Sequence, residues 1–76
     1  MYNIETMGRT VLGNVQRLCK KKGMSIRKLE AVSGVSHDAI YEWGKRYTPG
    51  LATAAMVANA LEVTVEELLE VENHDA

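Results

Sequence analysis

The sequence has few of the residues that form disulfides, and it lacks a long apolar run of the kind that spans a membrane. It holds one cysteine, so no disulfide can form within the chain, and we expect a reducing cytoplasm. Its most apolar stretch, residues 51–61, is eleven residues long and is interrupted by Thr53 and Asn59. A membrane span needs about 20 apolar residues. We therefore expect no span, and the N-terminal residues give no sign of a secretion leader.

Residues suited to catalysis or metal binding are also few. The two histidines, His37 and His74, are far apart and do not form a zinc-ligand spacing with Cys19. Gly44–Lys45 matches the end of a phosphate-binding loop, but the first glycine and the final Ser or Thr of that loop are absent. We therefore expect no enzyme, no metal, no cofactor and no small-molecule ligand.

The length of 76 residues allows one domain, residues 1–76. Its hydrophobic content of 46% with 25% charged residues is that of a globular chain. We expect the packed part at residues 8–69 and an acidic, frayed tail at residues 71–76. A domain of this size buries only about 60% of the surface that its unfolded chain exposes, so its stability is marginal or shared with a partner.

Positive charge is missing from the end of the chain. The formal net charge of −1 by itself argues against a nucleic-acid partner, because neutralising phosphates requires Lys and Arg. However, residues 1–61 hold all nine Lys and Arg with four acids, a net +5, whereas residues 62–76 hold six acids and no base, a net −6. The net charge of the whole chain therefore does not show that positive and negative charge are separated along the sequence.

Apolar residues recur at helical spacing in five segments, and no segment alternates as a strand does. The sequence predicts an all-α fold with helices at about 7–22, 26–33, 37–45, 51–61 and 65–70. Thr6 is the best N-cap of the first helix, and Gly23 ends it. The residues expected in the core are Val11, Leu12, Val15, Leu18, Cys19, Ile26, Leu29, Val32, Ala39, Ile40, Trp43, Leu51, Ala54, Val57, Ala58, Leu61, Val65, Leu68, Leu69 and Val71. Part of the last stripe, residues 65–71, is alternatively a dimer contact.

Three of these helices begin with the same local signal. Ser25, Ser36 and Thr64 are N-cap residues framed by hydrophobic staples, and Thr64 also forms a capping box with Glu67. Only Gly34–Val35 separates the second helix from the cap of the third. A link this short makes the two helix axes cross steeply, which predicts a helix-turn-helix.

The pattern as a whole is similar to a known family. The matching residues are Gly23–Ser25, Leu29, Gly34–Ser36, Ile40, Trp43, Pro49, Ala58, Leu61, Val63–Thr64 and Glu67–Leu68. In this order and spacing they resemble the Cro and lambda-repressor (XRE-like) helix-turn-helix domain over residues 8–69. The resemblance implies a compact five-helix domain of bacterial and phage regulators, whose third helix enters the DNA major groove and whose members commonly bind two-fold operators as dimers.

The sequence departs from that family at several supporting positions. Many members have a phosphate-contacting Gln where Ile26 stands, and a small Ala where Glu30 stands. A branch resembling phage repressors of Gram-positive bacteria carries Leu-Glu at the latter position and a Trp at Trp43. The Arg and Glu that many members pair are Cys19 and Gly44 in this chain. Because both partners are replaced together, no buried charge is left alone.

The face of the third helix that the core does not use supplies the candidate base readers. Carboxylates accept hydrogen bonds from cytosine N4, and a histidine donates to guanine. These candidates are His37, Asp38, Tyr41 and Glu42. Basic and hydroxyl side chains that flank the helix are the candidates for contacts to the DNA backbone, and they are Ser25, Arg27, Lys28, Ser36, Lys45, Arg46, Tyr47 and Thr48.

Each reader also has a plainer interpretation. Asp38 has a favourable place near the positive helix end, Glu42 is within reach of Lys45 or Arg46, and Tyr41 can pack against the domain. We expect a sequence-specific double-stranded DNA-binding regulator in a bacterial cytoplasm, a phage- or prophage-type repressor that binds as a homodimer. The alternative is a protein-binding module of the antitoxin or antirepressor kind, which the acids of the third helix and the acidic tail favour.

Overall fold

The protein is an assembly of helices joined by short turns. The computed structural model describes residues 4–36, 38–45 and 50–70, with side chains from residue 7 onward. The helices are α1 (Ile4–Lys22), α2 (Ile26–Ser33), α3 (Ala39–Glu42), α4 (Leu51–Leu61) and α5 (Val65–Leu69). No strand occurs within those ranges, and the expected all-helical fold is confirmed.

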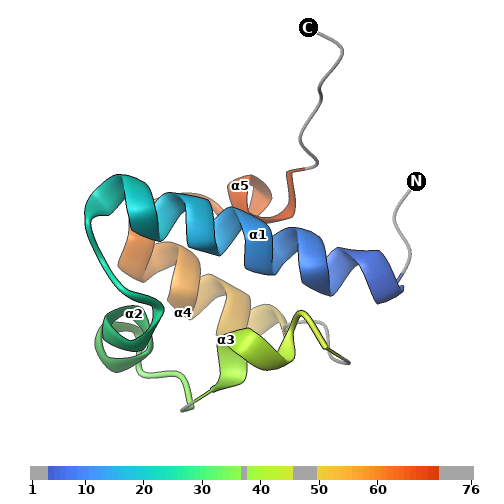
Figure 1. The fold of residues 1–76 in the computed structure, drawn as a ribbon, viewed down its shortest axis with the longest axis horizontal. Helices are drawn as coiled ribbons and strands as arrows, with labels where there is room; N and C mark the ends of the chain where they lie inside the picture. The colour runs from blue at the N-terminus through green and yellow to red at the C-terminus, as the bar shows by residue number, and fades with distance from the viewer. Residues whose placement is uncertain (1–3, 37, 46–49, 71–76) are drawn as a thin grey trace, which may run out of the picture.

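The helices form two groups on opposite sides of a central pair. Figure 1 shows α1 and α4 in the middle of the molecule, α2 and α3 below them and α5 above them. α5 packs against α1 and α4, whereas α2 packs against α4, α1 and α3. The acidic helix α5 therefore lies away from the α2–α3 pair.

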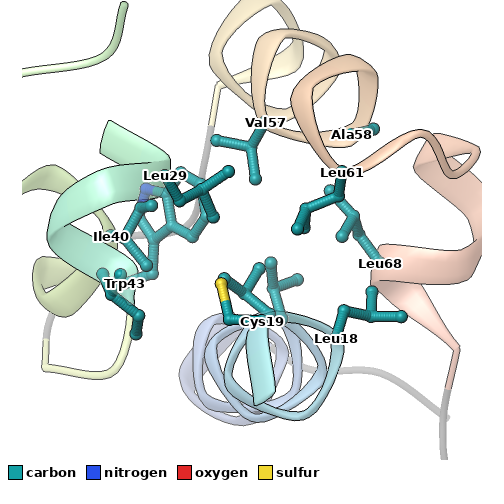
Figure 2. Close-up of a cluster of buried hydrophobic side chains, with 12 residues drawn as sticks. Leu18, Cys19, Leu29, Ile40, Trp43, Val57, Ala58, Leu61 and Leu68 are labelled. Carbon is teal, nitrogen blue, oxygen red and sulfur yellow. The ribbon is translucent and has the colours of Figure 1, made fainter. Parts of the chain in front are cut away.

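The core lies where the five helices converge. Figure 2 looks along α1 and shows labelled side chains from every helix pointing toward one another. Cys19 and Trp43, expected in the core, are 3% and 5% exposed. The largest fully buried side chains are Leu29, Ile40, Leu61, Leu68, Val11, Val15 and Val57. Truncating one of these Leu or Ile side chains to Ala costs about 2–5 kcal/mol.

Two residues expected in the core are outside it. Val32 is 51% exposed and Leu51 is 80% exposed. Successive helical residues turn by about 100°, so Val32 lies roughly a quarter of a turn from the face centred on Ile26 and Leu29. Leu51 is the first residue of α4, whose buried residues begin at Ala54. Val71 lies outside the described residues.

The predicted caps of α2 and α5 are confirmed. Ser25 Oγ accepts a hydrogen bond from Lys28 N at 3.0 Å. Thr64 Oγ1 accepts one from Glu67 N at 3.1 Å, and Glu67 Oε1 accepts one from Thr64 N at 3.2 Å, which completes the capping box. Gly34 ends α2 at a φ of 82°, in the left-handed region that glycine adopts readily.

The other boundaries differ from the prediction. α1 begins at Ile4 and not at residue 7, so Thr6 lies inside the helix and is not its cap. α5 ends at Leu69 rather than at residue 70. These are fraying differences at helix ends, where local sequence signals are weakest.

The third helix is much shorter than residues 37–45. Ser36 is not its N-cap, because Asp38 takes that place at a φ of 67° and its side chain makes no capping bond. A left-handed residue cannot continue a right-handed helix, so α3 cannot extend back through Asp38. After α3 the chain continues in turns with i to i+3 hydrogen bonds, from Gly44 N to Tyr41 O at 3.2 Å and from Lys45 N to Glu42 O at 3.0 Å.

A buried amide fixes the end of α5 on α1. Asn14 is 7% exposed, and its Nδ2 donates to Leu68 O at 2.7 Å and to Glu70 O at 2.9 Å. Its Oδ1 accepts a hydrogen bond from Arg17 at 3.2 Å. A helix of five residues is too short to be stable in isolation, so these bonds and the burial of Leu68 hold it in place.

Candidate nucleic-acid interface

The α2–α3 unit has the features of a helix-turn-helix. The Ser25 cap fixes the start of α2, and the left-handed Gly34 reverses the chain at its end. Leu29 of α2 and Ile40 of α3 are both 0% exposed and point into the common core. Because both helices are anchored by these buried residues, their outer faces have a fixed relation to each other.

The candidate base readers that the structure describes lie on or beside α3. The Asp38 side chain is 55% exposed, Tyr41 is 42% exposed, and Glu42 is partly buried. The exposure of Tyr41 argues against the interpretation that it packs into the domain. Glu42 forms no ion pair with Lys45 in the described structure. His37 lies outside the described residues, so its place on this face stays a prediction.

The candidate backbone contacts flank α3 on both sides. Arg27 and Lys28 are exposed on α2, Ser25 and Ser36 are exposed at the helix boundaries, and Lys45 is exposed in the turn after α3. The remaining candidates, Arg46, Tyr47 and Thr48, lie outside the described residues. The structure thus brings five of the eight predicted backbone contacts to the α2–α3 unit.

One of these basic residues is engaged within the protein. Arg27 Nη1 lies 3.4 Å from Asp38 Oδ1, so a predicted phosphate contact and a predicted base reader form an ion pair. The same nitrogen lies 3.6 Å from Glu30 Oε1. The three residues form a charged bridge, the Glu30–Arg27–Asp38 bridge, that joins α2 to the start of α3.

Glu30 is the member of this bridge that sequence reasoning missed. Its carboxylate is 4% exposed, and neither oxygen accepts a hydrogen bond within the described structure. The 3.6 Å contact with Arg27 is therefore an ion pair without a hydrogen bond. The available signal was its position, because Glu30 follows Ile26 by four residues and shares the inward face of α2 with it.

Positive charge is not concentrated on the α2–α3 unit. Residues 23–50 hold four basic residues and three acids, whereas residues 1–22 hold five basic residues and one acid. Most of the positive surplus of the first 61 residues therefore lies on α1. At the end of that helix, Lys22 Nζ pairs with Glu62 Oε1 at 3.5 Å.

Other kinds of site are not formed by the described residues. No group of three potential metal ligands occurs among them. Cys19 is buried, and this burial raises the pKa of its thiol above the ordinary value of 9.0. A protonated thiol is a poor nucleophile. No helix in the described ranges has the length and apolarity needed to cross a membrane.

The fold and the exposed polar face of α2–α3 define a helix-turn-helix protein. The sequence profile of the Cro/C1-type HTH DNA-binding domain matches residues 14–74, which include α2 to α5 and part of α1. The chain belongs to this family and is a DNA-binding transcriptional regulator that acts on double-stranded DNA. Searches of curated proteins and of solved structures gave no significant match.

Proposed function

We propose that the protein is a repressor of phage or prophage type that acts as a single domain in the bacterial cytoplasm. It binds a two-fold operator in the major groove as a homodimer. The observation that supports this proposal most directly is that Tyr41 on α3 and Asp38 at its N-cap are exposed beside the basic residues of α2. Occupying an operator in this way excludes RNA polymerase from an overlapping promoter.

The chemistry of each side chain determines its proposed role in the site. Asp38, Tyr41 and Glu42, with His37, read base edges, because their donors and acceptors match base-pair patterns in the major groove. Lys28, with the other basic and hydroxyl candidates, contacts phosphates, which sets the register of α3 without reading sequence.

Selection of bound sites from a pool of random duplexes tests the proposal. The proposed repressor selects a consensus with two similar half-sites, about 10 base pairs apart from centre to centre, because each half-site receives one copy of α3. A single unrepeated half-site would contradict the dimer. Failure to enrich any sequence at low salt would overturn DNA recognition and favour the protein-binding alternative.

A second test compares the substitution of a predicted base reader with the substitution of a predicted phosphate contact. Tyr41→Ala removes a 42% exposed side chain from α3 and is expected to change which sequences are selected. Lys28→Ala removes an exposed phosphate contact and is expected to weaken all sequences by a similar factor. Uniform weakening by Tyr41→Ala together with altered selection by Lys28→Ala would reverse the assigned roles.

A further inference from the structure

The guanidinium of Arg27 lies between two carboxylates that belong to different helices. Glu30 is three residues further along α2, and its Oε1 is 3.6 Å from Arg27 Nη1. Asp38 lies across the turn, and its Oδ1 is 3.4 Å from the same nitrogen. One side chain therefore connects a buried acid of α2 with an exposed acid at the start of α3.

Glu30 is the fixed end of this bridge. Its side chain is 4% exposed, whereas those of Arg27 and Asp38 are 57% and 55% exposed. Packing restricts a buried side chain to one geometry, but an exposed arginine samples many rotamers in water. Attraction to a charge held in place by the core therefore narrows the range of positions that the Arg27 guanidinium samples.

Asp38 is the end that needs positioning. It is an N-cap whose side chain makes no capping hydrogen bond, and its backbone has the left-handed φ of 67°. The helix that follows is four residues long, which gives little rigidity by itself. The ion pair with Arg27 fixes the carboxylate from the side of α2.

We propose that Glu30 and Arg27 are positioning residues that determine sequence specificity through Asp38. The inference rests on the proposed function, in which Asp38 reads a base edge. Glu30 orients Arg27, and Arg27 holds the Asp38 carboxylate in the direction required to accept a hydrogen bond from a base. A side chain that hydrogen-bonds directly to a base must be held in the orientation that this bond requires. Loss of the bridge therefore reduces discrimination between base pairs at the one position that Asp38 contacts.

This role differs from that of a phosphate contact in a measurable way. A residue that contacts only phosphate affects all duplexes alike, because the phosphate backbone carries no sequence information. A residue that positions Asp38 affects only the base pair that Asp38 reads. Lys28 is the matched control, because it is the adjacent exposed basic residue of α2 and forms no ion pair in the described structure.

The experiment uses the full chain and a set of duplexes in which each base pair of the selected site is changed in turn. Binding is measured for the wild type, Asp38→Asn, Arg27→Gln, Glu30→Gln and Lys28→Gln, and thermal unfolding confirms that each variant is folded. Asp38→Asn is expected to reduce discrimination at one base pair of each half-site by about tenfold. Arg27→Gln and Glu30→Gln are expected to reduce discrimination at that same base pair. Lys28→Gln is expected to leave it unchanged and to weaken all duplexes alike.

The double variant Glu30→Gln/Asp38→Asn adds a second readout. Because both residues act on one contact, the double variant is expected to discriminate no worse than Asp38→Asn alone. Full discrimination in both Arg27→Gln and Glu30→Gln would overturn the inference while leaving DNA recognition intact. Unchanged discrimination in Asp38→Asn would overturn it as well, and absence of wild-type binding to every duplex would instead overturn the proposed function on which it rests.

Discussion

Cys19 is a buried thiol whose ionisation is coupled to folding. Burial raises its pKa in the folded state above 9.0, so the folded chain keeps the proton at a pH where the unfolded chain releases it. The stability that this thiol contributes is present below the unfolded pKa and is lost as the pH rises through the folded pKa. The loss is at most about 1.4 kcal/mol per pH unit.

Urea unfolding of the wild type and of Cys19→Ala between pH 7 and pH 10.5 checks this expectation. Other groups titrate in the same range, so the comparison between the two chains isolates the thiol. The wild type is expected to lose more stability above pH 9 than the variant does. Parallel pH profiles would show that Cys19 does not titrate differently in the two states.

At the scale of single residues, the hydrophobic pattern predicts which apolar residues are buried but does not predict which polar residues are buried beside them. Cys19 and Trp43 were predicted to be buried because they continue apolar stripes. Asn14 and Glu30 are also buried, at 7% and 4% exposure, and they lie on the same helix faces as apolar residues. A hydrophobic pattern treats them as exposed because their side chains are polar. For Asn14 the burial also depends on a partner far along the chain, the carbonyl of Leu68 that accepts its hydrogen bond.

At the scale of the helices, substitution by alanine is expected to have opposite effects on stability at two exposed glycines. Gly34 ends α2 at a φ of 82°, where an L side chain is strained whatever the space. Gly13 lies inside α1, and an added Cβ there meets nothing within 4 Å. Gly13→Ala is therefore expected to raise the free energy of unfolding by about 0.5–1 kcal/mol, and Gly34→Ala to lower it by roughly 1–2 kcal/mol.

Thermal unfolding measures both substitutions with the same readout. For a domain of this size, 1 kcal/mol shifts Tm by roughly 4–8 °C, so the two variants are expected to lie on opposite sides of the wild type. If Gly34→Ala were as stable as Gly13→Ala, the left-handed end of α2 would not be a feature of the native state.

The presence of the helices is easier to predict from the sequence than the start and length of α3. Ser25 and Thr64 marked the starts of α2 and α5 because caps act over three residues and need no distant partner. The same reasoning placed a cap at Ser36 and a helix over residues 37–45, but α3 covers Ala39–Glu42. The conformation of Asp38 accompanies its contact with Arg27, eleven residues earlier in the chain, and local rules do not include such contacts.

At the scale of the whole molecule, the fold places the acidic helix α5 away from the face assigned to DNA, although most of the positive surplus lies on α1, against which α5 packs. The acidic helix α5 lies on the side opposite to α2 and α3 (Figure 1). Glu66, Glu67 and Glu70 are exposed there and are kept away from the face assigned to DNA. In a chain with a net charge of −1, this placement weakens the repulsion between these carboxylates and DNA phosphates at the α2–α3 face, because interactions between exposed charges at physiological salt are largely screened beyond about 8 Å.

The central claim is that the α2–α3 face binds operator DNA through base readers framed by phosphate contacts. A salt titration of wild-type binding to the selected duplex tests it most directly. Three basic contacts per chain, from Lys28, Lys45 and Arg46, predict that log K falls against log salt with a slope of about −2.7 per chain and roughly twice that for a dimer. Lys28→Gln is expected to reduce the magnitude of the slope by about 0.9 per chain. A slope near zero, or a slope that Lys28→Gln leaves unchanged, would contradict the assignment of this face to DNA.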